Sequence, residues 1–253
     1  MLAYLGIPMT EIDGVRQHIF WCNDSFFHAA RIVQTAENPA NFYEYDIQSN
    51  TYIVWPWGYD WFLGTSLYLL KIIKPDLNIQ AMLVNMPPFI GFLNVFLFIG
   101  LLRQLKLNPL FLMMSLIIFC ASPLTQLLHL VGRIDHHMFE LSFVFATLWS
   151  GAAWFENMNS KRNAVIHALV LACSHLINYS LFILQLPTLV MMFVLWVQGK
   201  KVDSVKWFYI PLLATLLIIL LPSSYFREFW FDYRFFSWFH LYIAICVSCI
   251  VIY

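Results

Sequence analysis

The residues best suited to chemistry are crowded into one short segment, Gly132 to Glu140, which lies between two long apolar stretches. These stretches, Pro109 to Leu130 and Phe139 to Trp154, are each about long enough to cross a membrane at ~1.5 Å per helical residue. Ionisable side chains at a membrane boundary are costly unless they are paired, hydrated or bound to a metal, so the segment is a candidate functional site. An Asp-His pair in a loop also fits an ordinary hydrogen-bonded helix cap, and that alternative stays open. The ionisable residues of the segment are Arg133, Asp135, His136, His137 and Glu140.

A second acidic candidate, Asp24, lies in the polar N-terminal region, within the stretch Asn23 to Arg31. Asp24 or Ser25 is suited to cap a helix that runs to about Ala36, because a short oxygen side chain accepts hydrogen bonds from free backbone N–H groups. His28 follows Asp24 by four residues and could share its helix face. His28 could pack on that face or take part in a site.

The composition is that of a membrane protein. Of the 253 residues, 61% are hydrophobic and only 11% are charged. In a typical soluble domain, about a quarter of the residues are charged. Lys plus Arg equals Asp plus Glu at 14 each, which predicts no nucleic-acid partner and makes membrane lipids the expected surroundings. The five cysteines are scattered, mostly within apolar runs, and predict neither a disulfide framework nor a zinc site.

The elements that must position the candidate residues begin with an aromatic segment, Tyr52 to Trp61. Trp and Tyr favour the membrane interface, so this segment is predicted to lie along the membrane surface. The apolar run from Tyr59 to Ile73 is short for a crossing and ends at Lys71, Lys74 and Pro75. It is therefore predicted to form an interfacial helix.

Seven membrane-spanning helices are predicted to follow, with residues 1–78 as a long first external loop and residues 79–253 as the helical bundle. The apolar stretch from Ala164 to Val197 is too long for one crossing, and the polar break from Ser174 to Asn178 divides it. The predicted fold class is an all-α polytopic membrane protein. The predicted spans are Ile79–Leu102, Pro109–Leu128, His137–Phe155, Asn163–His175, Tyr179–Gln198, Val205–Leu221 and Trp238–Tyr253.

The charges of the loops orient this bundle, because short loops rich in Lys and Arg stay on the cytoplasmic side. Asp24 precedes the first predicted span and Asp135 follows the second, so both lie on the same side of the membrane. With the positive loops inside, that side is the outer face, where the two residues could form one site. Two acidic segments with a nearby imidazole suit a divalent cation that accepts oxygen and nitrogen ligands, such as Mn²⁺, or Mg²⁺ with added water. Such a cation could hold a pyrophosphate and neutralise its charge as it leaves. The positive loops contain Arg103 and Lys106, Lys161 and Arg162, and Lys200, Lys201 and Lys206.

Three segments together resemble the catalytic subunit of oligosaccharyltransferase, especially its archaeal and bacterial single-subunit forms, which belong to the GT-C glycosyltransferases. The first resembles the family's acidic motif in the first external loop. The second resembles its WPP-like segment, with Trp57 in place of the second proline, and the third resembles its Asp-x-Asp or Asp-His-His motif. The order and approximate spacing also match. The segments are Asn23 to Arg31, Trp55 to Trp61 and Gly132 to Glu140.

The resemblance implies that Asp24, Asp135 and His137 are the catalytic residues and the metal ligands, and that Asp24 also orients the acceptor amide. His136 and Glu140 resemble supporting residues, and at helical spacing Glu140 could orient either imidazole. The resemblance assigns the aromatic segment no clear catalytic role, and we expect its role to be structural. Its residues are Trp55, Trp57, Tyr59 and Asp60.

The family reaction moves a glycan from a polyprenyl phosphate or pyrophosphate carrier to the Asn side chain of a sequon in an acceptor polypeptide. The resemblance thus implies a lipid-linked donor, an acceptor polypeptide and a multi-pass protein of a prokaryotic cell membrane, with its active site on the outer face.

The sequence also departs from the family pattern. A first transmembrane helix, a later acidic external loop and a soluble C-terminal domain with a WWDYG motif are features of the family that this sequence lacks. We expect the chain to be the N-terminal part of such an enzyme, truncated or completed by a second chain. Two alternatives stay open: a polyprenyl-phosphate-dependent glycosyltransferase with a non-protein acceptor, and a non-catalytic or transport subunit. Transporters usually place ionisable groups near the bilayer midplane rather than at helix ends, so the last ranks lowest.

Overall fold

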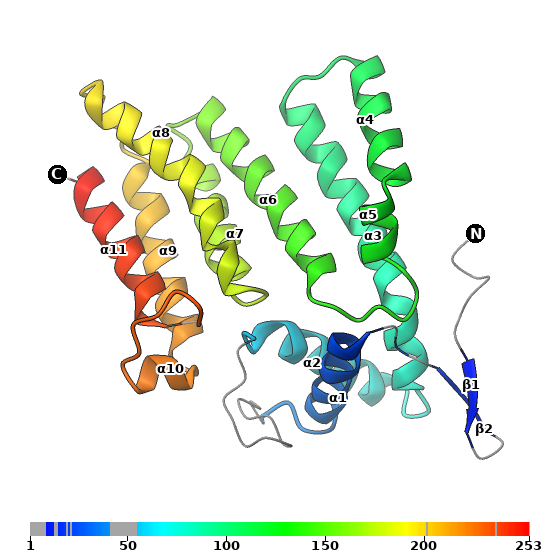
Figure 1. The fold of residues 1–253 in the computed structure, drawn as a ribbon. Helices are drawn as coiled ribbons and strands as arrows, with labels where there is room; N and C mark the ends of the chain where they lie inside the picture. The colour runs from blue at the N-terminus through cyan, green and yellow to red at the C-terminus, as the bar shows by residue number, and fades with distance from the viewer. Residues whose placement is uncertain are drawn as a thin grey trace. The chain divides into compact units, whose positions relative to one another are not determined.

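The computed structural model (Figure 1) describes residues 9–12, 15–18, 20, 22–40, 55–200, 202–235 and 237–252. Apart from one short hairpin, the regular elements within these ranges are helices. The hairpin pairs β1 (Met9–Ile12) with β2 (Val15–His18) in antiparallel register, and it was not predicted from the sequence. The chain divides into two compact units, which we describe separately.

The first unit contains the candidate site. It comprises residues 1–43, 58–99 and 107–142. Its helices α1 and α2 lie side by side. The predicted interfacial segment is indeed a helix, α2. The helices of this unit are α1 (Asn23–Glu37), α2 (Gly58–Ile73), most of α3 (Ile79–Gln104), α4 (Pro109–Ala121), α5 (Pro123–Leu128) and the first turns of α6 (His137–Glu156).

Helix α1 is amphipathic, and its buried residues recur every three or four positions, as expected for one helix face. Helices α1 and α2 pack closely at Gly64 of α2. A Cβ added to Gly64 would lie 2.5 Å from the Cβ of Thr35 and 2.8 Å from the carbonyl oxygen of Ile32. The missing side chain of Gly64 therefore sets the distance between the two helices. The buried residues of α1 are Ser25, His28, Ala29, Arg31, Ile32, Thr35 and Ala36.

Helix α4 has an apolar surface that the described part of the chain does not bury. The side chain of Asn108 accepts a hydrogen bond from the backbone N–H of Phe111 at 3.0 Å, and Pro109 occupies the first helical turn, so the start of the helix is well specified. None of its residues is buried, although most are large and apolar. Such a surface is stable against lipid rather than water.

The second unit comprises residues 44–57, 100–106 and 143–253. Its core forms around Trp154, whose ring stacks on that of Phe208 at a centroid distance of 4.9 Å and whose Nε1 donates to Ser204 at 3.0 Å. The buried imidazole of His167 contacts Ser150 and Thr188 within the same unit. Its helices are the remainder of α6, α7 (Lys161–Ser174), η2 (Tyr179–Gln185), α8 (Leu186–Val197), α9 (Val205–Leu220), α10 (Ser224–Arg227) and α11 (Trp238–Ile252).

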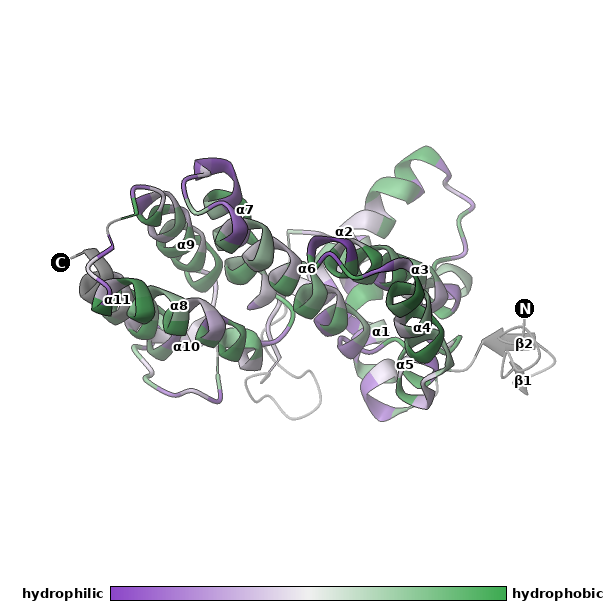
Figure 2. Ribbon diagram, turned by 90° about the horizontal axis from the view of Figure 1, so that it is seen from above, coloured by the Kyte–Doolittle hydropathy of each residue, from purple (hydrophilic) through white to green (hydrophobic). Residues whose placement is uncertain are grey.

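Three of the described helical segments are long and apolar enough to cross a membrane: Ile79–Gln104, His137–Glu156 and Tyr179–Val197. Each coincides with a predicted span. Two other predicted spans form shorter apolar helices, α4 and α9. The predicted span Pro109–Leu128 is interrupted at Ser122, since the following Pro123 cannot continue the hydrogen bonding of α4 and instead starts α5. Figure 2 shows hydrophobic residues along the long helices and hydrophilic residues at helix ends, as at the start of α7.

The predicted seventh span ends at Tyr253, which lies outside the described residues; the helix found there, α11, covers Trp238–Ile252. The structure gives four cysteines as free thiols: Cys22, Cys120, Cys173 and Cys246.

Candidate active site

The loop before α6 is fixed by its backbone and by two buried apolar side chains. Gly132 has a φ of 86°, a conformation that favours glycine, and its N–H donates to the carbonyl oxygen of Val84 on α3 at 2.8 Å. Ile134 and Met138 on either side of the charged residues are fully buried. These anchors hold Asp135 and its neighbours in one place.

Asn94 in α3 holds the first turns of α6 in place through hydrogen bonds. Asn94 is fully buried, and its amide donates to the carbonyl oxygen of Met138 at 2.9 Å and lies 2.8 Å from Nε2 of His129. The hydroxyl of Ser142 donates to Oδ1 of Asn94 at 2.6 Å. A buried amide with three partners fixes the helix that carries the site imidazoles.

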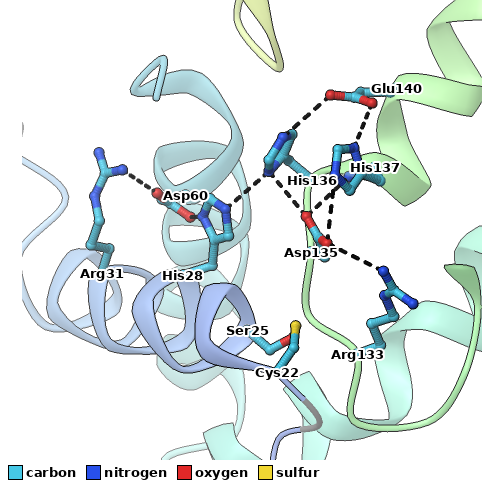
Figure 3. A network of polar contacts seen from close by, with 10 residues as sticks. All are labelled: Cys22, Ser25, His28, Arg31, Asp60, Arg133, Asp135, His136, His137 and Glu140. Atoms are coloured by element: carbon cyan, nitrogen blue, oxygen red, sulfur yellow. Dashed lines mark hydrogen bonds and ion pairs between the residues drawn. The ribbon is translucent and has the colours of Figure 1, made fainter. Parts of the chain in front are cut away.

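Asp135 is the centre of the charged network (Figure 3). It is only 3% exposed. Its Oδ1 lies 3.1 Å from Nδ1 of His136, and its Oδ2 lies 3.8 Å from both Nε2 of His137 and Nη2 of Arg133. The carboxylate therefore faces imidazoles on two sides.

Glu140 contacts both adjacent imidazoles, as Figure 3 shows. Its Oε1 lies 3.3 Å from Nε2 of His136, and its Oε2 lies 2.7 Å from Nδ1 of His137. One carboxylate on the first turn of α6 thus contacts two rings, as helical spacing allows, and its hydrogen bond with Nδ1 of His137 fixes the orientation of that ring.

A second group of side chains comes from α1 and α2 and reaches the same network (Figure 3). Nδ1 of His28 lies 2.8 Å from Oδ1 of Asp60, whose Oδ2 is 2.7 Å from Nη1 of Arg31. Nε2 of His28 lies 3.0 Å from Nδ1 of His136. His28, Asp60 and His136 are each at most 2% exposed, so this is a buried connection between α1, α2 and the Asp135 loop.

The electrostatics of the network favour a positively charged group between the carboxylates. Burial lowers the pKa of His136, but hydrogen bonds to Asp135 and Glu140 outweigh it and raise that pKa to about 9. Burial likewise raises the pKa of Asp135, but hydrogen bonds and positive charge from His136 and His137 hold it below its usual value. The two carboxylates thus favour the protonated form of His136.

Two groups of potential metal ligands occur among the described residues, each with ligand atoms within 4.8 Å of one another. One consists of His28, Asp135 and His136, and the other of His136, His137 and Glu140. Asp24 is in neither group. It lies in the first turn of α1 with an exposed side chain, one position ahead of the buried face that begins at Ser25.

The aromatic segment has residues in both units. Trp57 belongs to the second unit, where its Nε1 donates to the carbonyl oxygen of Ile219 at 3.3 Å, and Trp55 is half-buried. Tyr59 belongs to the first unit, where its buried ring meets those of His28 and Phe139 edge-on at centroid distances of 5.0 and 5.7 Å. Tyr59 thus forms an apolar wall beside the imidazoles.

The link through Asp60 and Arg31 was missed by the sequence analysis. Two signals were available: Asp60 is an acidic residue in a dense aromatic run, and Arg31 follows His28 by three residues, which places both on one helix face. Neither signal indicates that these two helices meet.

An apolar cavity of about 530 Å³ lies in the first unit, next to the network. Phe139, which follows the two site imidazoles in the chain, lines it together with Phe62 of α2. The other lining residues are Leu63, Ser66, Ala81, Met82, Asn85, Met86, Phe89 and Ile90.

The described chain is a helical protein with three candidate membrane spans, which is the pattern of a multi-pass membrane fold. It has a cluster of carboxylates and imidazoles at the start of α6. Solved structures with a similar fold include those of the oligosaccharyltransferase from Archaeoglobus fulgidus. Its apo form matches with a TM-score of 0.65 and 20% identity over 91% of this chain and 29% of that chain. Its complex with Zn and sulfate matches with a TM-score of 0.69 and 19% identity over 93% and 31%.

A third structure, of the same archaeal enzyme with an inhibitory peptide and a dolichol-phosphate, gives a TM-score of 0.66 and 19% identity over 93% of this chain and 29% of that chain. The chain thus spans about three-tenths of the length of the proteins it resembles. No protein-family model matches the sequence, and no curated relative matches it.

Proposed function

We propose that the chain is part of a membrane glycosyltransferase of the oligosaccharyltransferase type, which moves a glycan from a polyprenyl phosphate or pyrophosphate carrier to an asparagine of an acceptor polypeptide. The observation that carries this proposal is the buried carboxylate of Asp135 among imidazoles, in a chain with the fold of oligosaccharyltransferase structures. Those structures include one tethered to an acceptor peptide with an NVT sequon and one with a dolichol-phosphate.

The donor atoms around Asp135 fit a divalent cation. A buried carboxylate flanked by imidazole nitrogens offers mixed oxygen and nitrogen ligands, which suit Mn²⁺, and Mg²⁺ where water completes its shell. We assign Asp135 and His137 as ligands, with Asp24 as the third. When bound, the cation would stabilise negative charge on the departing phosphate.

The remaining residues of the network prepare the site. Glu140 holds the imidazole of His137 in one orientation through its 2.7 Å contact with Nδ1, which leaves Nε2 turned to Oδ2 of Asp135. Asp24, with its exposed carboxylate on α1, is the residue proposed to hold the amide of the acceptor.

The apolar cavity supports a lipid-linked donor. Its wall residue Phe139 lies two positions after His137 in the chain, so a ligand with an apolar chain in the cavity could place its phosphate near Asp135. Burial of an isoprenoid chain against such side chains is favourable at about 25 cal/mol per Å² of apolar surface.

The position in the membrane is part of the proposal. With seven crossings, residues 1–78 would form an external loop and residues 79–253 the bundle, and positive loops would place Asp24 and Asp135 on the outer face of a prokaryotic cell membrane.

A transfer assay tests the function. Membranes containing the protein are given a polyprenyl-diphosphate-linked oligosaccharide, Mn²⁺ and a labelled peptide with an Asn-x-Thr sequon; a Gln-x-Thr peptide is the matched control. We expect a glycan to be added to the Asn peptide alone, and roughly 100-fold slower transfer with Asp135→Asn, because a ligand and a charge are lost.

Undiminished transfer by Asp135→Asn would refute the assigned site. Transfer of sugar to a lipid or glycan, with both peptides unmodified, would instead support the alternative of a non-protein acceptor. Loss of solute uptake after the same substitution, with no effect on transfer, would favour a transport subunit.

A further inference from the structure

Helix α3 contains two adjacent prolines, Pro87 and Pro88, in its interior. Because proline has no backbone N–H, it removes the donor for the carbonyl groups three and four residues before it. The two prolines affect one carbonyl in common, since Pro87 lies three residues and Pro88 four residues after Val84. The carbonyl oxygen of Val84 can therefore accept neither the α-helical nor the 3₁₀-type hydrogen bond within α3.

The carbonyl groups on either side of Val84 each lose only one of these two donors. Leu83 still has the N–H of Met86 three residues further along. Asn85 still has the N–H of Phe89 four residues further along. Val84 is fully buried, and a buried carbonyl without a donor destabilises the fold. The prolines thus leave a single backbone acceptor on α3 that needs a donor from outside the helix.

That donor comes from the loop that carries Asp135. The N–H of Gly132 donates to the carbonyl oxygen of Val84 at 2.8 Å, and the φ of Gly132, 86°, is one that favours glycine. In a straight helix the ring of Pro88 would clash with this same carbonyl, so the proline also favours an acceptor turned away from the helix axis. The loop is attached to α3 at the carbonyl that both prolines release.

A second contact with α3 holds the other end of the loop. Nδ2 of Asn94 donates to the carbonyl oxygen of Met138 at 2.9 Å. The segment 132–138 is therefore tied to one helix at both ends, through a backbone carbonyl at its start and a side-chain amide at its end. Asp135 lies midway between these two contacts, so loss of either would allow its carboxylate to shift.

We propose that Pro88 is a positioning residue for the Asp135 loop, because it keeps the carbonyl of Val84 available to the N–H of Gly132. The inference rests on the proposed function for its effect on catalysis, whereas the hydrogen bond itself is a property of the fold. Displacement of a reacting group by about 1 Å can slow a reaction by roughly 100-fold. A proline that only bends α3 would have no such effect on the loop.

Amide hydrogen exchange of the full chain in detergent, followed by mass spectrometry, tests the hydrogen bond. Pro88→Ala supplies an N–H four residues after Val84, and alanine is a far better helix former than proline. We expect the amides of residues 130–138 to exchange roughly 10-fold faster in Pro88→Ala, as for the loss of one hydrogen bond. The temperature of thermal unfolding should stay unchanged or rise.

The matched control is Pro211→Ala, the same substitution inside helix α9 of the second unit. Exchange of the amides of residues 130–138 should be the same in this variant as in the wild type. If both substitutions accelerated exchange equally, the effect would be a general loosening of the protein, and the inference would be wrong.

The transfer assay with the Asn-x-Thr peptide measures the consequence for the site. We expect the kcat of Pro88→Ala to fall by roughly 10- to 100-fold while the KM for the peptide changes little, since the loss concerns the transition state. Pro211→Ala should have the kcat and KM of the wild type. A loss of folded protein alone would instead lower thermal stability together with kcat.

The outcomes separate this inference from the proposed function. Unchanged exchange in Pro88→Ala overturns the inference, and so does a lower temperature of unfolding or failure to fold. Fast exchange of the Gly132 amide in the wild type overturns it without any variant. Faster exchange with unchanged transfer overturns the positioning role and leaves the proposed function standing. A wild type that transfers no glycan refutes the proposed function, while the exchange rates still decide whether Pro88 keeps the loop attached.

Discussion

At the scale of single residues, the site is a chain of charged and imidazole groups whose members depend on one another. Arg31, Asp60, His28, His136 and Glu140 are linked by contacts of 2.7 to 3.3 Å. When one member of a buried chain of contacts is removed, its neighbour stays buried without a hydrogen-bond or charge partner. The resulting loss of stability is larger than the net free energy that the contact itself contributes. Substitutions within the network should therefore affect both stability and metal binding.

Asp60→Asn is expected to destabilise the first unit by roughly 3 kcal/mol, because it leaves the guanidinium of Arg31 buried without its counter-charge. Denaturant unfolding of the purified protein in detergent measures this change. Asp76→Asn, at an exposed turn between α2 and α3, removes the same charge and should change the free energy of unfolding by less than about 0.5 kcal/mol. Equal effects of the two substitutions would show that the buried pair is not needed.

Glu140→Gln should weaken Mn²⁺ binding by roughly 10- to 100-fold, since an amide cannot accept N–H groups from both His136 and His137 through two oxygens. Titration of the protein with Mn²⁺, followed by electron paramagnetic resonance of the free ion, gives the affinity. Glu156→Gln, which alters an exposed carboxylate paired with Lys106, serves as the control. Unchanged Mn²⁺ affinity in Glu140→Gln would contradict a supporting role for this residue.

At the scale of helices, the site depends on how α1 packs against α2. Each helix brings one half of the His28–Asp60 contact, and their separation is set where Gly64 meets Thr35 and the backbone of Ile32. Neither helix alone holds an imidazole in place.

Gly64→Ala is expected to cost about 1 to 3 kcal/mol of stability, because its Cβ would overlap Thr35 and the carbonyl oxygen of Ile32, and the backbone cannot yield easily. Thermal unfolding of the purified protein measures this effect. Ser66→Ala, two residues further along α2, is the control; a Gly64→Ala protein as stable as this control would refute close packing at this point.

At the scale of the whole molecule, the membrane orientation remains a prediction from loop charge. It is tested with single cysteines in a background from which the five native cysteines have been removed. Asp76→Cys lies in the exposed turn before α3, and Asn159→Cys lies in the exposed turn before α7. In intact cells, a membrane-impermeant thiol reagent should label the first and reach the second only after permeabilisation. The reverse pattern would place the Asp135 loop on the inner face.

The sequence by itself determined the class of structure and the main segments of the site. Long apolar runs have few alternatives to helices in a membrane, since every backbone polar group must be satisfied internally, and three predicted spans coincide with helices of sufficient length. Charged residues are rare in such a chain, so the Asp135 loop stood out from local pattern alone. Helical spacing likewise predicted that Glu140 could reach either neighbouring imidazole.

Only the tertiary structure decided which residues meet. His28 and His136 are 108 positions apart, and their contact depends on helix packing that no local pattern records. The phase of α1 turns His28 and Arg31 inward while Asp24, one position ahead of the buried face, is exposed. The pairing of Asp60 depends on the same helix packing. Burial of one face of α2 against α1 brings the carboxylate of Asp60 to the buried guanidinium of Arg31. A buried carboxylate without such a counter-charge would strongly destabilise the fold.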